Sequence, residues 1–589
     1  MADLSRGGDW FAVLPDCAAA SAAAQSFTGG AVQLVAHPSG RPWLVGRWPG
    51  PALTRSSDHR GTQTALLGCA AGPAPDAAGS FHVVTATGGG QVTVRGTASG
   101  VRRVFHARIG GVTVAADQAR VLASTTGAGP DPAAVAGLLL APSVPHPLGE
   151  DSLWQGVTAV PPDHRLTVGP DGTARTDRWW HPPEPDGPLV AGGDRLRAAL
   201  RAAVAVRLPA GGGPVSADLS GGTDSTALCF LAAELGADLV TVRVAPLDPA
   251  SDDPLWAGRA ADWLPGEHLL VDPAAGFAEL PGPAGPDDAE EPVGGLLTRA
   301  LLGHTARLVA GRGSRRHLAG YGGDEVTGVS RAYLRDLLWR RPGLVLRHLP
   351  AHRSLRHWSL PAVLLALADQ RSYRGWLAGT ASRLRAAGPL EDRPQFGWGG
   401  ATQLPAWATP LAADLLVDRL ARAAAAAEPL ARDRAQHRAV TAVWSAGHAA
   451  RQLGRAMPGV ELATPYLDDQ VVAAALAVDL AERGTPWRYK PLLTEAMRPV
   501  LPEQLRERRT KGKFTADGIA GLRRHRAWLV GLCEDLQLAR LGLVDPAPLR
   551  AACVGLDPTG RVLMAVENTI SAELWLRAAA AVGGPVEAA

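Results

Sequence analysis

A strand, a glycine-rich turn, a helix and a second strand follow one another over residues 215–244, and this run constrains the fold most strongly. Val215–Leu219 is a short strand, and Thr226–Leu235 has a helical spacing of apolar residues that stops at Gly236. Leu239–Val244 is mostly apolar and β-branched, which is typical of a strand buried on both faces of a parallel sheet. This order is a βαβ unit, so the sequence predicts an α/β domain with a parallel sheet.

The turn of this unit has the sequence Asp-Leu-Ser-Gly-Gly-Thr-Asp-Ser over residues 218–225. Gly221 and Gly222 let a ligand approach the backbone closely, and the N-terminus of the following helix adds partial positive charge. Ser220 and Ser225 add hydroxyl donors, so the turn suits a phosphate chain. It is not the Walker loop, because the lysine of that loop is missing. Asp224 beside phosphates requires a cation between them and is therefore a candidate Mg²⁺ ligand.

A second glycine-rich turn follows a predicted strand at His317–Ala319 and reads Gly-Tyr-Gly-Gly-Asp-Glu over residues 320–325. The glycines that permit close approach of a ligand here are Gly320, Gly322 and Gly323. Open parallel sheets bind ligands at the carboxyl ends of their strands, so the two turns can face one metal-bound triphosphate. Asp324 is then the second candidate Mg²⁺ ligand.

The rest of the chain divides by composition. A length of 589 residues is too long for one compact domain. Residues 1–180 are predicted to be mostly β, because short apolar runs are cut by glycine and proline clusters, which favours a sandwich or layered sheet. The proline-rich residues 181–188 are a predicted linker. Residues 331–385 are rich in arginine and poor in acids, and they are expected to be helical.

Composition also argues against several classes of protein. The five cysteines show no CxxC spacing, which argues against a disulfide scaffold or a four-cysteine zinc site; they stand at positions 17, 69, 229, 533 and 553. A net charge of +3 is too small to indicate nucleic-acid binding. No apolar run reaches the ~18 residues of a membrane helix, and the first residues lack the apolar core of a signal peptide. We therefore expect a cytoplasmic protein that binds neither nucleic acid nor membrane.

Lysine is nearly absent from the chain. Lysine and arginine together number 59, yet the only lysines are Lys490, Lys511 and Lys513. A GC-rich genome explains the preference for arginine but not the clustering of the three lysines. Lysine is a compact, mobile point charge, whereas arginine is a planar fork. A functional need for lysine in this stretch and chance both stay open at this point.

Three further segments complete a pattern: Gly459-Val-Glu-Leu-Ala-Thr-Pro-Tyr-Leu-Asp468, Arg488-Tyr-Lys-Pro-Leu-Leu493 and Arg508-Arg-Thr-Lys-Gly512. With the two glycine-rich turns, and in this order, they resemble the synthetase half of class B asparagine synthetases over about residues 195–530. The first turn also looks like the pyrophosphate loop of the ATP-pyrophosphatases, which cleave ATP between its α- and β-phosphates. Residues 154–162 and Trp179-Trp180 resemble the tail of the family's glutaminase domain.

The resemblance implies two domains. Residues 1–185 would form a degenerate glutaminase-like (Ntn-type) α+β domain with a β-sandwich. Residues 190–589 would form an α/β synthetase domain of the ATP-pyrophosphatase type, with an Arg-rich helical insertion at about 331–440. One departure matters, because the family's glutaminase uses a cysteine directly after the initiator methionine. Residue 2 is alanine here and Cys17 is internal, so the amine is expected to come from the substrate rather than from glutamine.

Relatives without that cysteine form β-lactams or the macrolactam rings of lasso peptides. Residues 11–16, 37–45 and 485–493 look like the lasso-peptide cyclases of actinobacteria. The resemblance then implies that ATP adenylates an Asp or Glu side chain of a precursor core peptide, and that the peptide's N-terminal amine closes the ring. A leader-peptide-binding protein and a leader protease would be partners. A small-molecule amide ligase (a β-lactam synthetase or an ammonia-dependent asparagine synthetase) and a binding scaffold without catalysis stay open as alternatives.

The same resemblance implies which residues would bind ATP and Mg²⁺. Leu219 and Val244 would lie against the adenine. The phosphates would be held by the two turns, through Ser220, Gly221, Gly222, Asp224, Ser225, Gly320, Gly322 and Gly323. Asp224 and Asp324 would bind the Mg²⁺.

It also implies the residues that carry the chemistry. Tyr321 and Glu461 would form a dyad that takes the proton from the attacking amine. Lys511 would stabilise the transition state, and Lys490 would contact phosphate oxygens. Lys513 is expected on the surface, and His448 is expected to be structural.

Overall fold

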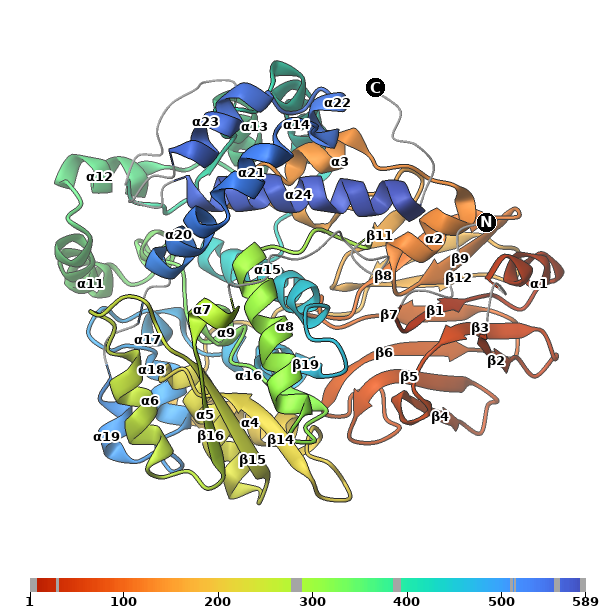
Figure 1. Cartoon of the computed structure of the whole chain (residues 1–589), viewed down its shortest axis with the longest axis horizontal. Coiled ribbons are helices and arrows are strands. Elements are labelled where there is room, and N and C mark those ends of the chain that lie inside the picture. Colours follow the sequence, from red (N-terminus) through yellow and green to blue (C-terminus); the bar gives the residue numbers. More distant parts are fainter. Residues whose placement is uncertain are drawn as a thin grey trace.

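The computed structural model describes residues 8–27, 31–276, 289–384, 393–508, 512, 515–555 and 562–582. Three large sheets organise this part of the chain: two of six strands in the N-terminal third and one of five strands further on. The fold is mixed α/β, as the sequence predicts. Figure 1 shows the N-terminal sheets on one side of the molecule, the five-stranded sheet on the other, and helices above both.

The N-terminal sheets form a sandwich, which confirms the predicted β character of this region. One has the order β11-β8-β9-β1-β3-β2 and the other β13-β12-β7-β6-β5-β4, and all of their pairs are antiparallel. Phe11 and Trp43 of the first sheet share a core with Val84 and Leu166 of the second. The strands of the first sheet are β1 (Trp10–Val13), β2 (Gln33–Ala36), β3 (Pro42–Arg47), β8 (Val104–Ile109), β9 (Val112–Ala116) and β11 (Thr158–Val160). Those of the second are β4 (Leu53–Ser57), β5 (Gln63–Ala70), β6 (Gly79–Ala86), β7 (Val92–Arg95), β12 (His164–Val168) and β13 (Ala174–Arg178).

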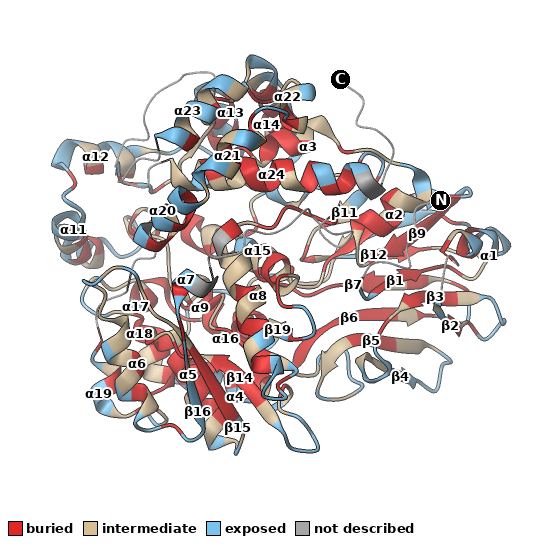
Figure 2. Cartoon of the chain, viewed as in Figure 1, coloured by how far each residue is buried: buried red, intermediate tan, exposed pale blue. Residues whose placement is uncertain are grey.

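The five-stranded sheet is parallel throughout, with the order β16-β15-β14-β17-β19. Its strands are β14 (Pro214–Asp218), β15 (Asp238–Val244), β16 (Glu267–Val271), β17 (Arg316–Leu318) and β19 (Glu461–Ala463). One face packs on α4 (Leu189–Ala205) and α5 (Thr223–Glu234), where Val215 and Ala217 meet Leu228. The other face packs on α8 (Leu296–Ala310) and the end of α15 (Arg434–Gly454), where Val242 meets Leu302. Figure 2 shows these central strands as buried.

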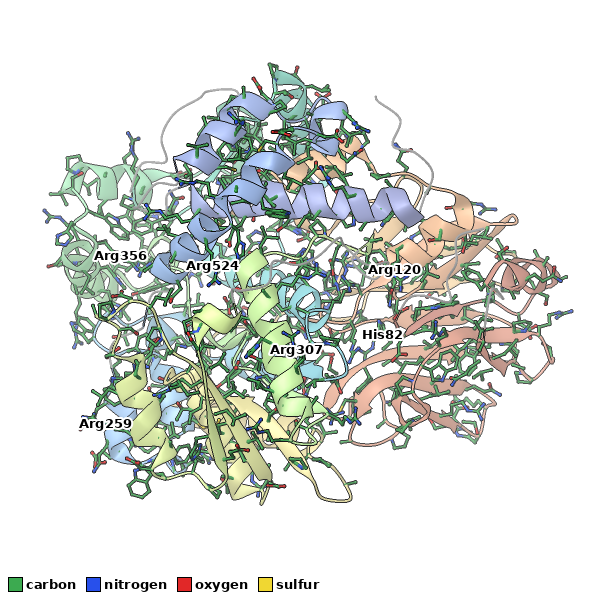
Figure 3. All side chains as sticks on the ribbon, viewed as in Figure 1. His82, Arg120, Arg259, Arg307, Arg356 and Arg524 are labelled. Atoms are coloured by element: carbon green, nitrogen blue, oxygen red, sulfur yellow. The ribbon has the colours of Figure 1, made fainter. Side chains whose placement is uncertain are left out.

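The region of the predicted insertion is helical, as expected. It contains α10 (Tyr333–Leu337), α11 (Pro342–Arg356), α12 (Leu360–Ala368), α13 (Tyr373–Leu384) and α14 (Pro410–Ala426). Helices α11 and α12 extend to the periphery and are largely exposed in Figure 2, and Arg356 at the end of α11 is labelled in Figure 3. No helix of the described residues is long and apolar enough to span a membrane.

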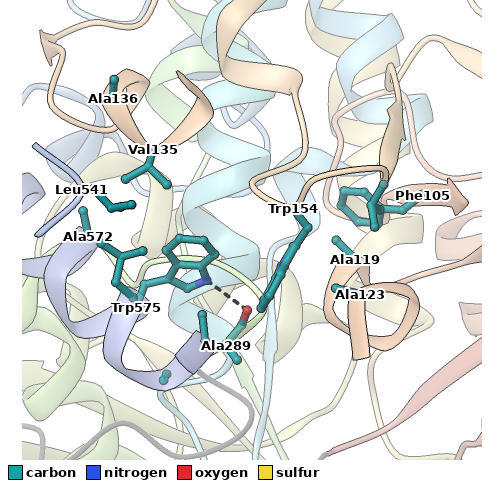
Figure 4. Packing of buried hydrophobic residues seen from close by; sticks show 14 of the residues in the cluster. Phe105, Ala119, Ala123, Val135, Ala136, Trp154, Ala289, Leu541, Ala572 and Trp575 are labelled. Carbon is teal, nitrogen blue, oxygen red and sulfur yellow. Dashed lines mark hydrogen bonds between the residues drawn. The ribbon is translucent and has the colours of Figure 1, made fainter. Parts of the chain in front are cut away.

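The C-terminal helices return to the N-terminal sheets. Trp575 on α24 (Leu563–Val582) packs edge-on against Trp154, with ring centroids 5.6 Å apart, and donates its indole N–H to the Ala289 carbonyl at 3.0 Å (Figure 4). The Glu290 carboxylate accepts the backbone N–H groups of Ala119 and Arg120 at 2.9 and 2.8 Å, at the start of α2 (Ala119–Thr126); Arg120 is labelled in Figure 3. One hydrophobic core therefore joins both ends of the chain, and the division at residues 185–190 stays a prediction.

Candidate active site

The carboxyl edge of the parallel sheet has a topological switch point beside β14. The chain runs from β14 through α5 to β15 on one side, and β17 is added later on the other side of β14. In open α/β sheets, ligands bind in the crevice outside the strand ends at such a point. Both glycine-rich turns lie there, because one follows β14 and the other follows β17.

The first turn is held by its own hydroxyl groups. The Ser220 and Ser225 Oγ atoms lie 3.0 Å apart, and the Gly222 N–H donates to the Ser220 Oγ at 3.3 Å. Gly221 has a φ of +89°, and a Cβ on it would lie 2.5 Å from the Asp253 carbonyl oxygen, so the position requires glycine. Helix α5 begins at Thr223, inside the turn, with Gly222 as its N-cap, so the positive end of the helix lies at the turn. The turn is therefore built to hold an anion.

The second turn packs directly onto the first. A Cβ on Gly323 would lie 2.5 Å from the Asp224 carboxylate carbon, and a Cβ on Gly320 would lie 3.0 Å from the Ser225 nitrogen. Gly322 has a φ of +87° and lies against Leu467. These glycines let the two turns touch, so their acidic residues come together, as the sequence predicts.

Lys490 lies between the two acidic residues. Its Nζ contacts an Asp224 carboxylate oxygen and lies 2.8 Å from the Asp324 Oδ1. Burial disfavours the ammonium, but these two carboxylates outweigh that effect and raise the pKa of Lys490. Tyr466 adds a further restraint, because its hydroxyl donates to the Asp224 carbonyl at 3.1 Å. The lysine predicted to contact phosphates thus lies at the junction of both loops.

The pair of carboxylates fits a magnesium ion that also binds phosphates. Mg²⁺ is typically held by one or two carboxylates together with substrate phosphates and water. Asp224 and Asp324 both contact one Lys490 Nζ, so a single small cation could reach both. Within the described residues, no group of three or more metal-ligating side chains occurs, so a cage made by protein alone is absent there.

Arg508 is a site residue whose role the sequence reasoning missed. Its guanidinium is almost fully buried and contacts the carboxylates of Asp252, at 3.0 Å, and Asp253. Among the described residues, its Nη1 has no hydrogen-bond partner, and this atom lies 3.2 Å from where a Cβ on Gly221 would be. A buried N–H donor beside the first turn suits a phosphate oxygen. The only sequence signal was its place in the Arg-x-Thr-Lys-Gly segment.

Tyr321 faces the sheet rather than the predicted glutamate. Its ring packs against the hydrophobic cluster that contains Val242 and Leu453, and burial followed by the negative charge of Asp218 raises the pKa of its hydroxyl. The Asp218 carboxylate lies 3.0 Å from the His317 Nε2, and the His317 Nδ1 lies 2.9 Å from the Ser216 hydroxyl. Asp218 and His317 are therefore the acid–base pair that the structure brings near Tyr321.

The predicted Tyr321–Glu461 dyad is not formed. Glu461 is the first residue of β19 and pairs in register with Arg316, at the amino edge of the sheet and away from both turns. Its carboxylate lies 2.8 Å from Arg316 and 3.8 Å from Arg102. Burial opposes its ionisation, but Arg316 and Arg102 outweigh that effect and lower the pKa of Glu461. The sequence did not predict β19, and a glutamate at the start of a strand cannot reach the other edge.

The two residues predicted to contact adenine lie at the carboxyl edge of the sheet. Leu219 is buried and directly follows β14, while Val244 ends β15 and is half-buried, so both lie at the carboxyl edge. The His448 Nδ1 lies 3.1 Å from a Glu291 carboxylate oxygen. Lys511 and Lys513 lie outside the described residues.

The parallel sheet, its switch point and the two glycine-rich loops define an α/β nucleotide-binding protein whose site suits a metal-bound triphosphate. The family model of asparagine synthase matches residues 195–577, and the chain belongs to this family, whose members form amide bonds at the expense of ATP. No curated protein matches the chain. A similar solved structure is glutamine phosphoribosylpyrophosphate amidotransferase from B. subtilis, complexed with ADP and GMP. It is 10% identical, the match covers 53% of this chain and 81% of that one, and the TM-score is 0.19.

Proposed function

We propose that this chain is an AMP-forming macrolactam synthetase, which joins an acidic side chain of a precursor core peptide to the peptide's own N-terminal amine. One observation carries the nucleotide part: Lys490 contacts Asp224 and Asp324, one from each glycine-rich loop, at the carboxyl edge of the sheet. The peptide part is supported by residues 11–16, 37–45 and 485–493, which resemble lasso-peptide cyclases.

The reaction has two steps. A carboxylate oxygen of the peptide first attacks the α-phosphorus of ATP, and the bond from that phosphorus to the bridging oxygen of pyrophosphate breaks. The amine nitrogen then attacks the acyl carbon, AMP leaves with the electrons of the acyl C–O bond, and the amine loses a proton. The peptide loses one water overall, and ATP becomes AMP and pyrophosphate. Holding the amine against the acyl group supplies much of the acceleration.

Different residues of the site would bind the pyrophosphate, hold the metal and stabilise the charge. The first turn, with Ser220 and the N-terminus of α5, would bind the departing pyrophosphate, and Arg508 would donate to it from beside Gly221. Mg²⁺, held by Asp224 and Asp324, would neutralise charge on the phosphates. Lys490 orients both carboxylates and adds a positive charge.

The attacking amine must also lose its proton. Tyr321 and the Asp218–His317 pair are the acid–base groups at this edge of the sheet, and we assign the proton transfer to them. In this assignment Asp218, rather than Glu461 as predicted from the sequence, is the carboxylate that works with Tyr321 in proton transfer.

The test uses the full chain with Mg-ATP and the core peptide encoded beside its gene, with AMP release and peptide mass followed together. We expect AMP and a peptide that has lost one water. Asp224→Ala should abolish both, whereas the exposed control Asp535→Ala should leave both unchanged. AMP formation with free aspartate or another small amino acid, but not with peptide, would replace the proposal with a small-molecule amide ligase. ATP binding without turnover on either would leave only a scaffold.

A further inference from the structure

A large cavity lies apart from the nucleotide loops, between the N-terminal sheets and the C-terminal helices. Its volume is about 690 Å³, within the range of about 300–1,000 Å³ for pockets that bury small ligands. Its walls come from residues 134–153, from α15 and from α24, and no residue of the two glycine-rich turns lines it. On the other side of Gln452, which lines the cavity, Leu453 belongs to the hydrophobic cluster on which Tyr321 packs.

One wall of the cavity is aromatic. The His146 ring meets the rings of Trp444 and His437 edge-on, with centroids 5.5 and 5.8 Å away, and Trp398 meets His437 at 5.6 Å. His437 contributes no charge, because burial holds its pKa well below its usual value. Such a wall suits apolar and aromatic side chains of a ligand.

Most charged groups of the cavity are already paired within the protein. Glu291 forms ion pairs with Arg451 and Arg455, and the His448 Nδ1 lies 3.1 Å from its carboxylate. Asp151 pairs with Arg419 in the same way. These paired groups stabilise the walls of the cavity, and their charges are already neutralised by one another rather than available to a ligand.

Glu567, Arg438 and Arg103 are the exceptions. Arg103 is held inside the wall, because its guanidinium donates to the Glu150 backbone carbonyl at 2.5 Å and lies over the Phe105 ring. Within the described part of the chain, the Glu567 carboxylate on α24 has neither a hydrogen bond nor an ion pair, and burial raises its pKa to about 7. The Arg438 guanidinium on α15 donates to the Gln395 carbonyl at 2.7 Å and pairs with no carboxylate of the described residues. Burial and the charge of Arg331 lower the pKa of Arg438 to about 10. A half-buried charge without a counter-ion is costly, so a ligand of opposite charge gains binding energy at each.

We propose that this cavity binds the linear peptide substrate before activation, with the peptide's N-terminal ammonium on Glu567 and a peptide carboxylate on Arg438. The inference rests on the proposed function, because it takes the substrate to be a peptide. A carboxylate on α24 and a guanidinium on α15, neither paired with an opposite charge of the described residues, line one aromatic cavity and match a zwitterion with apolar side chains. Holding both reacting groups in one pocket keeps them near each other before adenylation.

The test measures binding to the full chain without ATP by titration calorimetry. The probes are short synthetic linear peptides with a free N-terminus, one glutamate and several aromatic or aliphatic residues. The tightest binder is remade with an acetylated N-terminus and, separately, with glutamine in place of the glutamate. We expect acetylation to weaken binding to the unaltered chain about tenfold, and Glu567→Gln to do the same. The acetylated peptide should bind Glu567→Gln no more weakly than either change alone predicts, since both changes remove the same ammonium–carboxylate contact.

Arg438→Gln and the replacement of the peptide's glutamate by glutamine should each weaken binding as well. Combining these two changes should weaken binding no more than either change alone. The matched control is the exposed pair Arg374–Glu428, whose Glu428→Gln variant should bind every peptide as the unaltered chain does. Absence of binding by all peptides, or costs of acetylation and Glu567→Gln that simply add, would overturn the cavity assignment. Turnover to AMP and dehydrated peptide would then still support the proposed function. Coupled binding at Glu567 without any AMP formation would instead overturn the proposed function and keep the peptide site.

Discussion

At the scale of single residues, Lys490 combines three uncommon properties. It is buried, it contacts two carboxylates, and it has a φ of +44°, which few residues with a Cβ adopt. Such a backbone costs of order 1–3 kcal/mol and persists where the surroundings enforce it. Proline follows it at position 491 and starts α18 (Pro491–Ala496), which fixes the lysine at the helix entrance. Arginine's planar fork does not replace a point charge between two carboxylates, which explains a lysine here in a chain that otherwise uses arginine.

We therefore expect Lys490→Met to abolish AMP formation and to destabilise the fold by about 3–5 kcal/mol, because it removes the buried ammonium that both carboxylates contact. Adding Asp224→Asn should recover part of that stability without restoring activity. Chemical denaturation monitored by circular dichroism measures the stabilities. A double variant no more stable than Lys490→Met would contradict the ion-pair account.

Mutation of Glu461, unlike mutation of Lys490, is expected to change stability and AMP formation very little. Its side chain is 41% exposed and pairs with Arg316 at the far edge of the sheet. Exposed ion pairs contribute about 0–1 kcal/mol. Glu461→Gln should therefore lower stability by no more than that and leave AMP formation within about twofold of the unaltered enzyme. A loss of activity comparable to that of Asp224→Ala would restore Glu461 to the proton-transfer role.

At the scale of elements, the contact between the two turns depends on a missing side chain. A Cβ on Gly323 would lie 2.5 Å from the Asp224 carboxylate, which is too close without movement of the turn. We expect Gly323→Ala to abolish AMP formation while the chain stays folded. Gly258→Ala in α6 (Asp253–Ala261) is the matched control, because its Cβ meets nothing within 4 Å. That variant should keep its activity and gain about 0.5–1 kcal/mol of stability. Equal activity of both variants would show that the turns need no such contact.

The same elements show what the sequence can and cannot predict. The βαβ unit was predicted to within a few residues, because β-branched runs, glycines and helical spacing agree there. β19 was not predicted, since its three residues carry too little periodicity to mark a strand and no glycine-rich turn follows them, as one follows the equally short β17. That omission misplaced Glu461, because the edge at which a residue lies follows from its strand. Asp218 and His317 were also missed as a pair, because they are far apart in sequence and only the β14–β17 register joins them.

At the scale of the whole molecule, several buried carboxyl groups make stability depend on pH. Burial raises the pKa of Asp117 to about 7 and those of Asp336 and Asp469 to about 6. Between about pH 4 and pH 7 these three groups bind more protons in the folded state than in the unfolded state, so their contribution to stability falls as pH rises through this range. Asp117→Asn keeps an acceptor for the Phe11 N–H, bonded now at 2.9 Å, and should flatten the fall. Denaturant titrations at several pH values check this, and an unchanged slope would contradict it.

The shared core makes a final prediction about cooperativity. Trp575 is buried against Trp154 and bonds to the Ala289 carbonyl, so α24 packs on the N-terminal half of the chain. If that packing joins the sheets into one cooperative unit, calorimetry of the full chain should show a single unfolding transition. Trp575→Ala should cost about 3–5 kcal/mol and lower that transition as a whole, because it empties a site shared by both ends of the chain. Trp339→Ala, whose side chain is 78% exposed in the native chain, should change stability by less than about 0.5 kcal/mol. Two separate transitions, only one of them shifted by Trp575→Ala, would mean that the N-terminal sheets fold independently of the synthetase.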